Sequence, residues 1–228
     1  MIPTARLAVN APPKYQLIAF DVDGTLVDSD DRKVVWQLLN ARFGCGDVEE
    51  TTRFQAYMRK EITYPEWVDL DVGEWVRAGA TRDQLSEIIL AHLRLVPGAR
   101  ETALELRARG YRLAVISGTL DLTLELLFPE HPFEEVFTNR IWFDGDGRIA
   151  GWQATPYDME GKAEALSAMA TRMNVPLAAT VFVGDNINDL QVMARAGLAV
   201  AFEPKHPSVT AAAAAVVRGD LRGLLDLL

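Results

Sequence analysis

The sequence predicts an α/β fold: a Rossmann-like parallel sheet flanked by helices, with a helical cap inserted after the first strand. Short apolar runs that resemble buried strands alternate with segments of helical periodicity. This is the order expected of parallel strands joined by crossover helices. Several of the runs end abruptly in polar residues, and open α/β sheets place their ligands at such strand ends. The alternation is interrupted once, at residues 29–94, by helical segments alone.

This interruption divides the chain into a discontinuous catalytic core, residues 14–28 and 95–228, and a cap, residues 29–94. Pro97-Gly98 marks the return of the chain into the core. Because the insertion directly follows the first strand, the cap should lie over the strand ends and control the access of water. Within the cap we expect helices at about residues 32–43, 50–60, 65–76 and 82–93.

The first strand begins at Leu17 and ends in two carboxylates, Asp21 and Asp23, followed by Gly24 and Thr25. Strand alternation would direct the two carboxylates to the same side, and like charges held close need a cation or a shared proton. Asp21 could attack phosphorus, Asp23 could serve as general acid and base, and Mg²⁺ would neutralise the pair. Thr25 could donate to phosphate oxygens. A polar turn with Gly24 at positive φ is the alternative.

A second apolar strand, from Leu113, ends in Ser117-Gly118-Thr119, and a helix is expected from about Leu120. The free N–H groups at the start of that helix could receive an anion. A simple helix cap by Ser117 or Thr119 is the alternative, and capping uses the same geometry.

Lys162 lies in the first turn of another predicted helix, directly after Gly161, with apolar residues on one face. A lysine at this position opposes the helix dipole, which favours an anion nearby. It could hold the nucleophilic carboxylate and the phosphate together as a point charge. An exposed surface lysine is the alternative.

The strand that begins at Thr180 is followed by several polar residues, among them Asp185, Asn188 and Asp189. Asp185 is placed to be a further magnesium ligand, Asp189 could orient Lys162 or the ligand set, and Asn188 could donate to the phosphate. Capping and a turn would explain one such residue but not the whole group.

Together these residues resemble the four motifs of the haloacid dehalogenase superfamily, in the family's order. The resemblance implies Asp21 as nucleophile, Asp23 as general acid and base, Ser117 as the hydroxyl residue of the second motif and Lys162 as the lysine of the third. It also implies that the acids of the fourth motif are Asp185 and Asp189. The pattern Asp21-Val-Asp23-Gly24-Thr25 matches the family's first motif residue by residue.

The function predicted from this resemblance is a magnesium-dependent phosphatase that hydrolyses a small phosphomonoester through an aspartyl-phosphate. Magnesium would be held by the carboxylates of Asp21 and Asp185 and by the backbone carbonyl of Asp23. The residues expected to contact the substrate are Thr25, Ser117, Gly118, Thr119 and Asn188. A phosphotransferase or phosphomutase of the same superfamily is the main alternative, followed by a haloacid dehalogenase and by a non-catalytic binding module.

Within the superfamily the chain is similar to the phosphoserine phosphatase branch, through Thr138-Asn139-Arg140 and an Asp-Gly hairpin at residues 144–147. The acid that would recognise the serine amine corresponds roughly to Asp30. The arginine that would bind the serine carboxylate is missing from residues 66–71. An unpaired, desolvated carboxylate is costly, so the sequence does not favour phosphoserine as the substrate.

The cap is rich in aromatic residues, namely Tyr57, Tyr64, Trp67 and Trp75. Trp67 and Trp75 fall on roughly one helical face and are expected to pack between cap helices. The alternative is that one of them faces the pocket, which would suit a partly apolar or planar leaving group. Asp69 and Asp71 could form a solvated face.

The formal net charge of −9 argues against nucleic acid or an anionic membrane as a partner. A small phosphorylated metabolite is expected instead, and the oligomeric state is left open. The single cysteine, Cys45, allows no internal disulfide and no zinc cluster, which fits a cytoplasmic protein. No apolar run reaches membrane-spanning length. Residues 1–13 contain three prolines and are expected to form a flexible leader.

Overall fold

The computed structural model describes residues 14–44 and 46–228, so the predicted leader and Cys45 lie outside it. Within this part of the chain the central sheet has seven strands in the order β6-β5-β4-β1-β7-β8-β9. Every neighbouring pair is parallel except β5 and β6, which confirms the predicted fold class. The strands are β1 (Leu17–Phe20), β4 (Arg112–Leu120), β5 (Glu135–Phe143), β6 (Ile149–Gln153), β7 (Thr180–Gly184), β8 (Leu198–Phe202) and β9 (Ala215–Val217).

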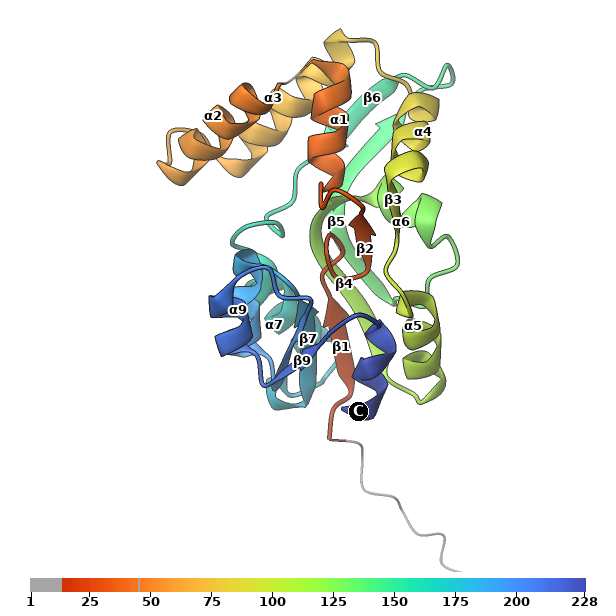
Figure 1. The fold of residues 1–228 in the computed structure, drawn as a ribbon, viewed down its shortest axis with the longest axis vertical. Helices are drawn as coiled ribbons and strands as arrows, with labels where there is room; N and C mark the ends of the chain where they lie inside the picture. The colour runs from red at the N-terminus through yellow and green to blue at the C-terminus, as the bar shows by residue number, and fades with distance from the viewer. Residues whose placement is uncertain (1–13, 45) are drawn as a thin grey trace, which may run out of the picture.

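Helices cover both faces of the sheet (Figure 1). The reason is visible in β1, whose side chains alternate between the two faces. Ile18 and Phe20 point into one apolar cluster, whereas Leu17 and Ala19 point into another, and all four are buried. Strands buried on both faces read as continuous apolar runs. The first cluster includes residues of α5 (Ala99–Ala108), α6 (Asp121–Leu127) and η3 (Leu221–Asp226). The second includes residues of α7 (Lys162–Arg172), η1 (Leu177–Ala179), α8 (Leu190–Arg195) and α9 (Pro207–Ala212).

Four helices between the first and second halves of the core lie at the top of the molecule in Figure 1. The prediction of four helical segments is confirmed, with errors of up to three residues at the ends. The first helix starts later than predicted because Arg32 has a positive φ of 59°, which a helix does not allow. The observed bounds are α1 (Val35–Phe43), α2 (Asp47–Met58), α3 (Tyr64–Arg77) and α4 (Arg82–His92).

A two-stranded antiparallel ribbon joins the ends of this helical insertion. It consists of β2 (Val27–Ser29) and β3 (Leu93–Leu95), with Val27 opposite Leu95 and Ser29 opposite Leu93. The sequence pattern does not indicate this ribbon, because each of its strands is only three residues long. The apolar residues of α1, α3 and α4 are continuous with the cluster on one face of the main sheet.

The β5–β6 hairpin extends upward among the same helices (Figure 1). Its turn at residues 144–147 was predicted and is confirmed by the bond from Gly147 N to the Asp144 carbonyl oxygen, 3.0 Å. The Trp152 indole donates to Asp69 on α3 at 2.7 Å, and Arg82 N donates to the Gly147 carbonyl at 2.8 Å. The hairpin is therefore attached to the helical insertion as well as to the sheet.

The predicted second apolar strand is confirmed, and its end lies one residue later than predicted. β4 continues through Ser117 to Leu120, with a shift in its register to β5 between Ile116 and Leu120. α6 then begins at Asp121. The Asp121 carboxylate accepts from the Leu122 N–H at 2.9 Å, so this chain's own side chain occupies a donor that had been expected to receive an anion.

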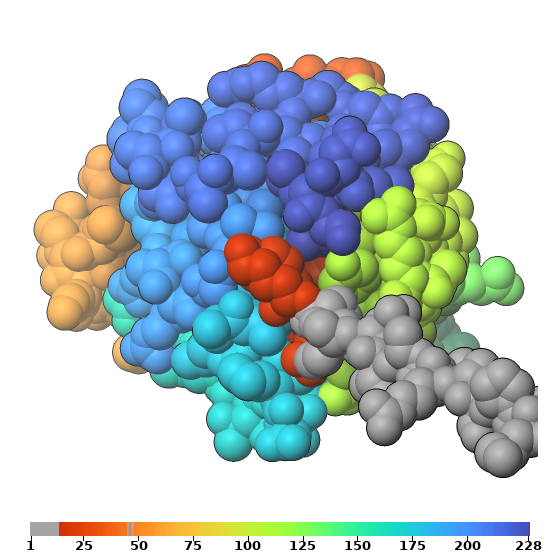
Figure 2. Space-filling view, turned by 90° about the horizontal axis from the view of Figure 1, so that it is seen from below, coloured from red at the N-terminus to blue at the C-terminus, as the bar shows by residue number. Residues whose placement is uncertain are grey.

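The two ends of the described chain meet on the side opposite α1–α4. Figure 2 shows the first described residues, in red, beside the C-terminal residues, in dark blue. The Tyr111 hydroxyl donates to the Leu228 carbonyl at 2.8 Å on this side. The helices of residues 14–44 and 46–228 are all too short or too polar to cross a membrane.

Gly98 is required where the chain returns from the insertion to the core. Its φ is +77°, and a Cβ there would lie 2.1 Å from Asp220 Oδ1 and 3.0 Å from Arg222 N. Gly79 has a similar φ of +73° but open space around it. We expect Gly79→Ala to lower the free energy of unfolding by about 1–2 kcal/mol through its backbone conformation. Gly98→Ala should cost clearly more, because the C-terminal segment must also move.

Urea unfolding of both variants checks this prediction, because it compares midpoints at an unchanged slope. Equal losses for Gly98→Ala and Gly79→Ala would contradict it.

Candidate active site

Strands that neighbour each other in the sheet bring the predicted site residues together. β1 lies between β4 and β7. Asp21 and Asp23 follow β1, Asp185 follows β7, and Ser117 lies near the end of β4. The carboxyl ends of parallel strands meet at one edge of the sheet, so segments far apart in sequence converge there, below the helical insertion.

Lys162 begins α7 and its side chain is buried, with 1% of its surface exposed. Its Nζ lies 2.9 Å from Asp21 Oδ2 and 2.7 Å from Asp189 Oδ1. Although burial alone would lower it, the two carboxylates together raise the pKa of Lys162. The lysine therefore stays charged and holds the ends of β1 and β7 together, and the alternative of an exposed surface lysine was wrong.

Three buried carboxylates, those of Asp21, Asp185 and Asp189, have oxygens within 4.8 Å of one another and could hold a metal ion. The Asp189 carboxylate already has hydrogen-bond partners in the protein, because its Oδ2 accepts from Asp185 N at 2.9 Å and from Asn186 N at 3.2 Å. Its role as the residue that orients Lys162 is thus the one that its contacts favour. Asp21 and Asp185 are left as the carboxylates suited to a cation.

The Oδ2 atom of Asp185 is buried and lacks a hydrogen bond of normal geometry. Lys205, on the loop after β8, places its Nζ 2.8 Å away in an ion pair. Burial, Asp21 and Asp189 raise the pKa of Asp185. The surroundings of this oxygen thus call for a cation, as the donor set of a hard metal ion does.

Gly24 and Thr25 fix the turn beside Asp185. Gly24 has a φ of +90°, and a Cβ would lie 2.2 Å from Asp185 Oδ2, so a larger residue would close this space. The Thr25 hydroxyl donates to Asp185 Oδ1 at 3.3 Å and its N–H to the Val22 carbonyl at 3.1 Å. Both donors of Thr25, expected to contact phosphate, have partners within the protein.

Asp23 lies beside Asp21 on the wall of a cavity of about 290 Å³, here called the carboxylate cavity. Burial, followed by the charge of Asp21, raises the pKa of Asp23 to about 7, and a hydrogen bond from the Thr119 side chain opposes the shift. A carboxyl group with such a pKa can donate and accept a proton near neutral pH. The predicted residues Ser117, Gly118 and Asn188 also line this cavity.

The Gly118 carbonyl connects the second motif to the helical insertion. It accepts from Trp36 Nε1 on α1 at 2.8 Å and from Asn139 Nδ2 on β5 at 2.6 Å. Asn139 Nδ2 also lies 2.7 Å from the Tyr64 hydroxyl on α3. In the sequence, Asn139 is marked only by the family resemblance and Trp36 by no motif, because only folding brings these residues to Gly118.

A second cavity of about 350 Å³, here called the aromatic cavity, shares Trp36, Asp158 and Lys205 with the first. Trp67 lines it, whereas Trp75 is fully buried and packs against Trp36 with ring centroids 5.3 Å apart. The expectation of packing between helices is therefore confirmed for Trp75. Trp67 packs on neighbouring rings and also faces the cavity.

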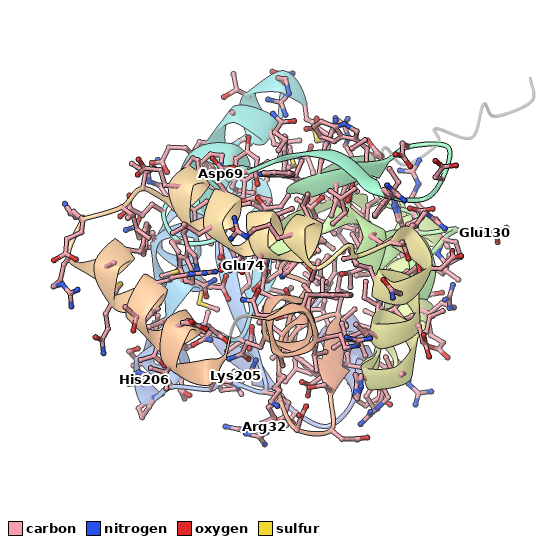
Figure 3. The ribbon with its side chains drawn as sticks, turned by 90° about the horizontal axis from the view of Figure 1, so that it is seen from above. Arg32, Asp69, Glu74, Glu130, Lys205 and His206 are labelled. Atoms are coloured by element: carbon pink, nitrogen blue, oxygen red, sulfur yellow. The ribbon has the colours of Figure 1, made fainter. Side chains whose placement is uncertain are left out.

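Asp69 is exposed, as a solvated face requires, but for Asp71 the prediction was wrong. Asp71 is buried on the wall of the aromatic cavity, where Arg53 NH1 lies 2.5 Å from its carboxylate. Arg53 also pairs with Glu74 at 3.2 Å. In Figure 3, Asp69 lies on the side of α3 toward the β-hairpin and Glu74 on the side toward α2, which carries Arg53.

Asp30, which the resemblance placed as the acid for a serine amine, does not line either cavity. It is exposed and forms an ion pair with Arg94. That interpretation is therefore not supported by the structure.

Asp158 is a residue of both cavities that the sequence analysis missed. It lies in an irregular segment before α7, where no periodicity marks it. A Cβ on Gly118 would lie 2.2 Å from its Cγ, so the glycine makes room for it. Its carbonyl accepts from Asn188 Nδ2 at 2.9 Å, so this amide, expected to contact phosphate, has a protein partner.

Comparison with known proteins finds relatives among phosphoserine phosphatases. The chain is 36% identical to phosphoserine phosphatase SerB2 of Mycobacterium tuberculosis over 192 residues, which is 83% of this chain and 44% of the relative. It therefore spans less than half the length of that protein. It is 28% identical to the phosphoserine phosphatase of Methanocaldococcus jannaschii, over 93% of this chain and 97% of the relative.

Among solved structures, a substrate-bound phosphoserine phosphatase complex has a TM-score of 0.72 and 26% identity, covering 94% of this chain and 99% of that one. The model of the haloacid dehalogenase-like hydrolases matches residues 15–197, which span the clustered carboxylates and Lys162. With the four motifs joined in one site on this sheet, the chain belongs to the haloacid dehalogenase-like hydrolase family.

Proposed function

We propose that this protein is a magnesium-dependent phosphatase that hydrolyses a small phosphomonoester through an aspartyl-phosphate on Asp21. The observation that carries the proposal is the pair of adjacent acids on one cavity wall. Asp21 is held by Lys162 at 2.9 Å, and the pKa of Asp23 is raised to about 7. The similarity to phosphoserine phosphatases supports it. A small phosphorylated metabolite as partner and a cytoplasmic location stay predictions.

In the proposed mechanism Asp21 is the nucleophile. Its Oδ1 accepts from the Val22 N–H at 2.8 Å and its Oδ2 pairs with Lys162, so the carboxylate is oriented before substrate arrives. An Asp21 oxygen bonds to phosphorus while the bond from phosphorus to the ester oxygen breaks. Asp23 gives its proton to that leaving oxygen.

In the second step Asp23 takes a proton from water, which attacks the phosphorus of the aspartyl-phosphate. The bond between phosphorus and Asp21 breaks, releasing phosphate and restoring both carboxyl groups to their starting states. Lys162 balances charge at Asp21 throughout, because its ammonium stays protonated. A group with a pKa close to neutral serves both as acid and as base, as this sequence of steps requires.

We assign the metal site to the carboxylates of Asp21 and Asp185 and the backbone carbonyl of Asp23. The cluster of carboxylate oxygens within 4.8 Å supports the fit, and the ion pair of Asp185 Oδ2 with Lys205 shows that this oxygen already attracts a cation. Bound there, Mg²⁺ would neutralise charge and polarise the phosphoryl group. Ser117, Gly118, Thr119 and Asn188 remain our candidates for holding the phosphate, with Thr25 steadying Asp185.

The proposal is tested directly by measuring phosphate release from a generic aryl phosphate, with magnesium and with a chelator. We expect release that depends on magnesium. Release only when an alcohol acceptor is present, with the phosphate transferred to it, would favour a phosphotransferase instead.

Asp21→Asn should lower kcat by about 10³-fold or more, because it removes the nucleophile that forms the covalent intermediate. The fold should be retained, as judged by circular dichroism. Asp146→Asn, on the exposed hairpin turn, is the matched control and should keep normal turnover. Normal activity of Asp21→Asn would refute the mechanism.

Without metal, thermal stability should fall as pH rises from about 5 to 8. The pKa of Asp23 in the folded protein is raised to about 7 and those of Asp185 and Asp189 are also raised, so the folded state binds more protons than the unfolded state in this range. Stability is thus present while these acids are protonated and is lost as they ionise.

Magnesium should raise Tm more at pH 8 than at pH 5, since the ion binds the ionised carboxylates. A difference of about 1 kcal/mol corresponds to about 2–4 °C for a protein of this size, which a thermal scan can resolve. A magnesium effect that is equal at both pH values would count against the assigned site.

A further inference from the structure

The lining of the aromatic cavity contains both acidic and basic residues, and Asp71 among the acids is already paired with Arg53. The acidic residues of this lining are Glu50, Asp71 and Asp158, and its basic residues are Arg32 and Lys205. Lys205 is held by Asp185 at 2.8 Å, and Arg32 is exposed, on the loop before α1 (Figure 3). Neither is a buried receptor for an anionic group.

The cation next to the wall of this cavity is also neutralised. Arg53 contacts both Asp71 and Glu74, at 2.5 and 3.2 Å, and Glu74 also pairs with Arg77 at 2.8 Å. The guanidinium of Arg53 is therefore engaged by the protein's own carboxylates. A carboxylate on a ligand would lose its water here and meet further negative charge, which is unfavourable.

Aromatic rings complete a surface that suits a cation. Trp36, Phe54, Tyr64 and Trp67 all line the cavity, and the centroids of the Tyr64 and Trp67 rings lie 6.2 Å apart. Trp36 is fixed by its bond to the Gly118 carbonyl and by its contact with Trp75. An ammonium group is attracted to the faces of such rings.

Asp158 connects this surface to the chemistry, because it lines both cavities. In the part of the chain that the structure describes, it forms no ion pair with a lysine or arginine. Lys162, whose charge acts on it, is bound to Asp21 and Asp189 instead. The Asp158 carboxylate is half-buried and interacts with the side chains of Tyr64 and Asn188, which carry no charge. A positively charged ligand would supply the counter-ion that these neutral groups do not.

We propose that the leaving group is a small amino alcohol that carries an ammonium group and no carboxylate, as in phosphoethanolamine or phosphocholine. This inference rests on the proposed phosphatase function. The phosphate would occupy the carboxylate cavity, and the ammonium would lie against Asp158 and the aromatic rings. Primary and quaternary ammonium groups share this chemistry, and the substrate panel below separates them.

The test compares kcat/KM, with magnesium, for esters that match in shape and differ in charge. Propyl phosphate is the neutral counterpart of phosphoethanolamine, and 3,3-dimethylbutyl phosphate is that of phosphocholine. Phosphoserine adds a carboxylate to phosphoethanolamine. We expect at least one cationic ester to exceed its neutral counterpart by about tenfold or more, and phosphoethanolamine to exceed phosphoserine.

Two variants test which residues cause the preference for the cationic ester. Asp158→Asn and Asp71→Asn each remove one negative charge, and in both the ratio of kcat/KM between the cationic ester and its neutral counterpart should fall severalfold. Asp69→Asn, on the exposed side of the same helix as Asp71, is the control and should keep the wild-type ratio. Circular dichroism checks that each variant is folded. If one of the two aspartate variants does not fold, the other alone is enough for the test.

The outcomes separate this inference from the function on which it rests. Hydrolysis of the aryl phosphate with equal rates for cationic and neutral esters, or with phosphoserine as the best substrate, would overturn the inference and leave the phosphatase intact. A charge preference that neither variant changes would also overturn it. No release from any ester would refute the phosphatase proposal, and this inference with it.

Discussion

The active site depends on one buried ammonium group, that of Lys162, held between Asp21 and Asp189. Carboxylates from the ends of β1 and β7 converge within 4.8 Å, and their mutual repulsion would separate these strands if nothing opposed it. Burying so many charges is costly unless each has partners. Asp189 shows how the cost is met: one oxygen bonds to Lys162 and the other accepts two backbone N–H groups.

A single carbonyl, that of Gly118, links this charged centre to the helices above it. Trp36 of α1 and Asn139 of β5 both donate to it, and Tyr64 of α3 contacts Asn139. The second motif and three separate elements therefore share one small network. Networks of this kind fix positions more strongly than isolated contacts, so the shape of the aromatic cavity is coupled to the catalytic strands.

Much of the fold and of the candidate site could be predicted, because they depend on local sequence patterns such as apolar runs and helical spacing. The apolar run before Asp21 and the helix that starts at Lys162 are visible in the sequence itself. By contrast, Asp158 lies in an irregular segment, and Asp71 is buried although Asp69, two residues earlier on the same helix, is exposed. The difference between the two acids follows from helical spacing, since Asp71 shares a face with the buried Val68 and Trp75. What the spacing does not indicate is the partner of Asp71, Arg53, which only folding brings near. β4 ends only one residue after its predicted end, because its pairing with β5 continues to Leu120.

The β2–β3 ribbon has a consequence for how such a chain can diverge. Because Val27 pairs with Leu95 and Ser29 with Leu93, the two ends of the helical insertion are held side by side. The entropy of closing a loop grows only slowly with its length, so residues can be gained, lost or rearranged beyond the ribbon at little cost to the sheet below. Under the proposed function, variation in leaving-group recognition can thus accumulate in the insertion while the strand ends that carry Asp21 and Asp185 remain unchanged.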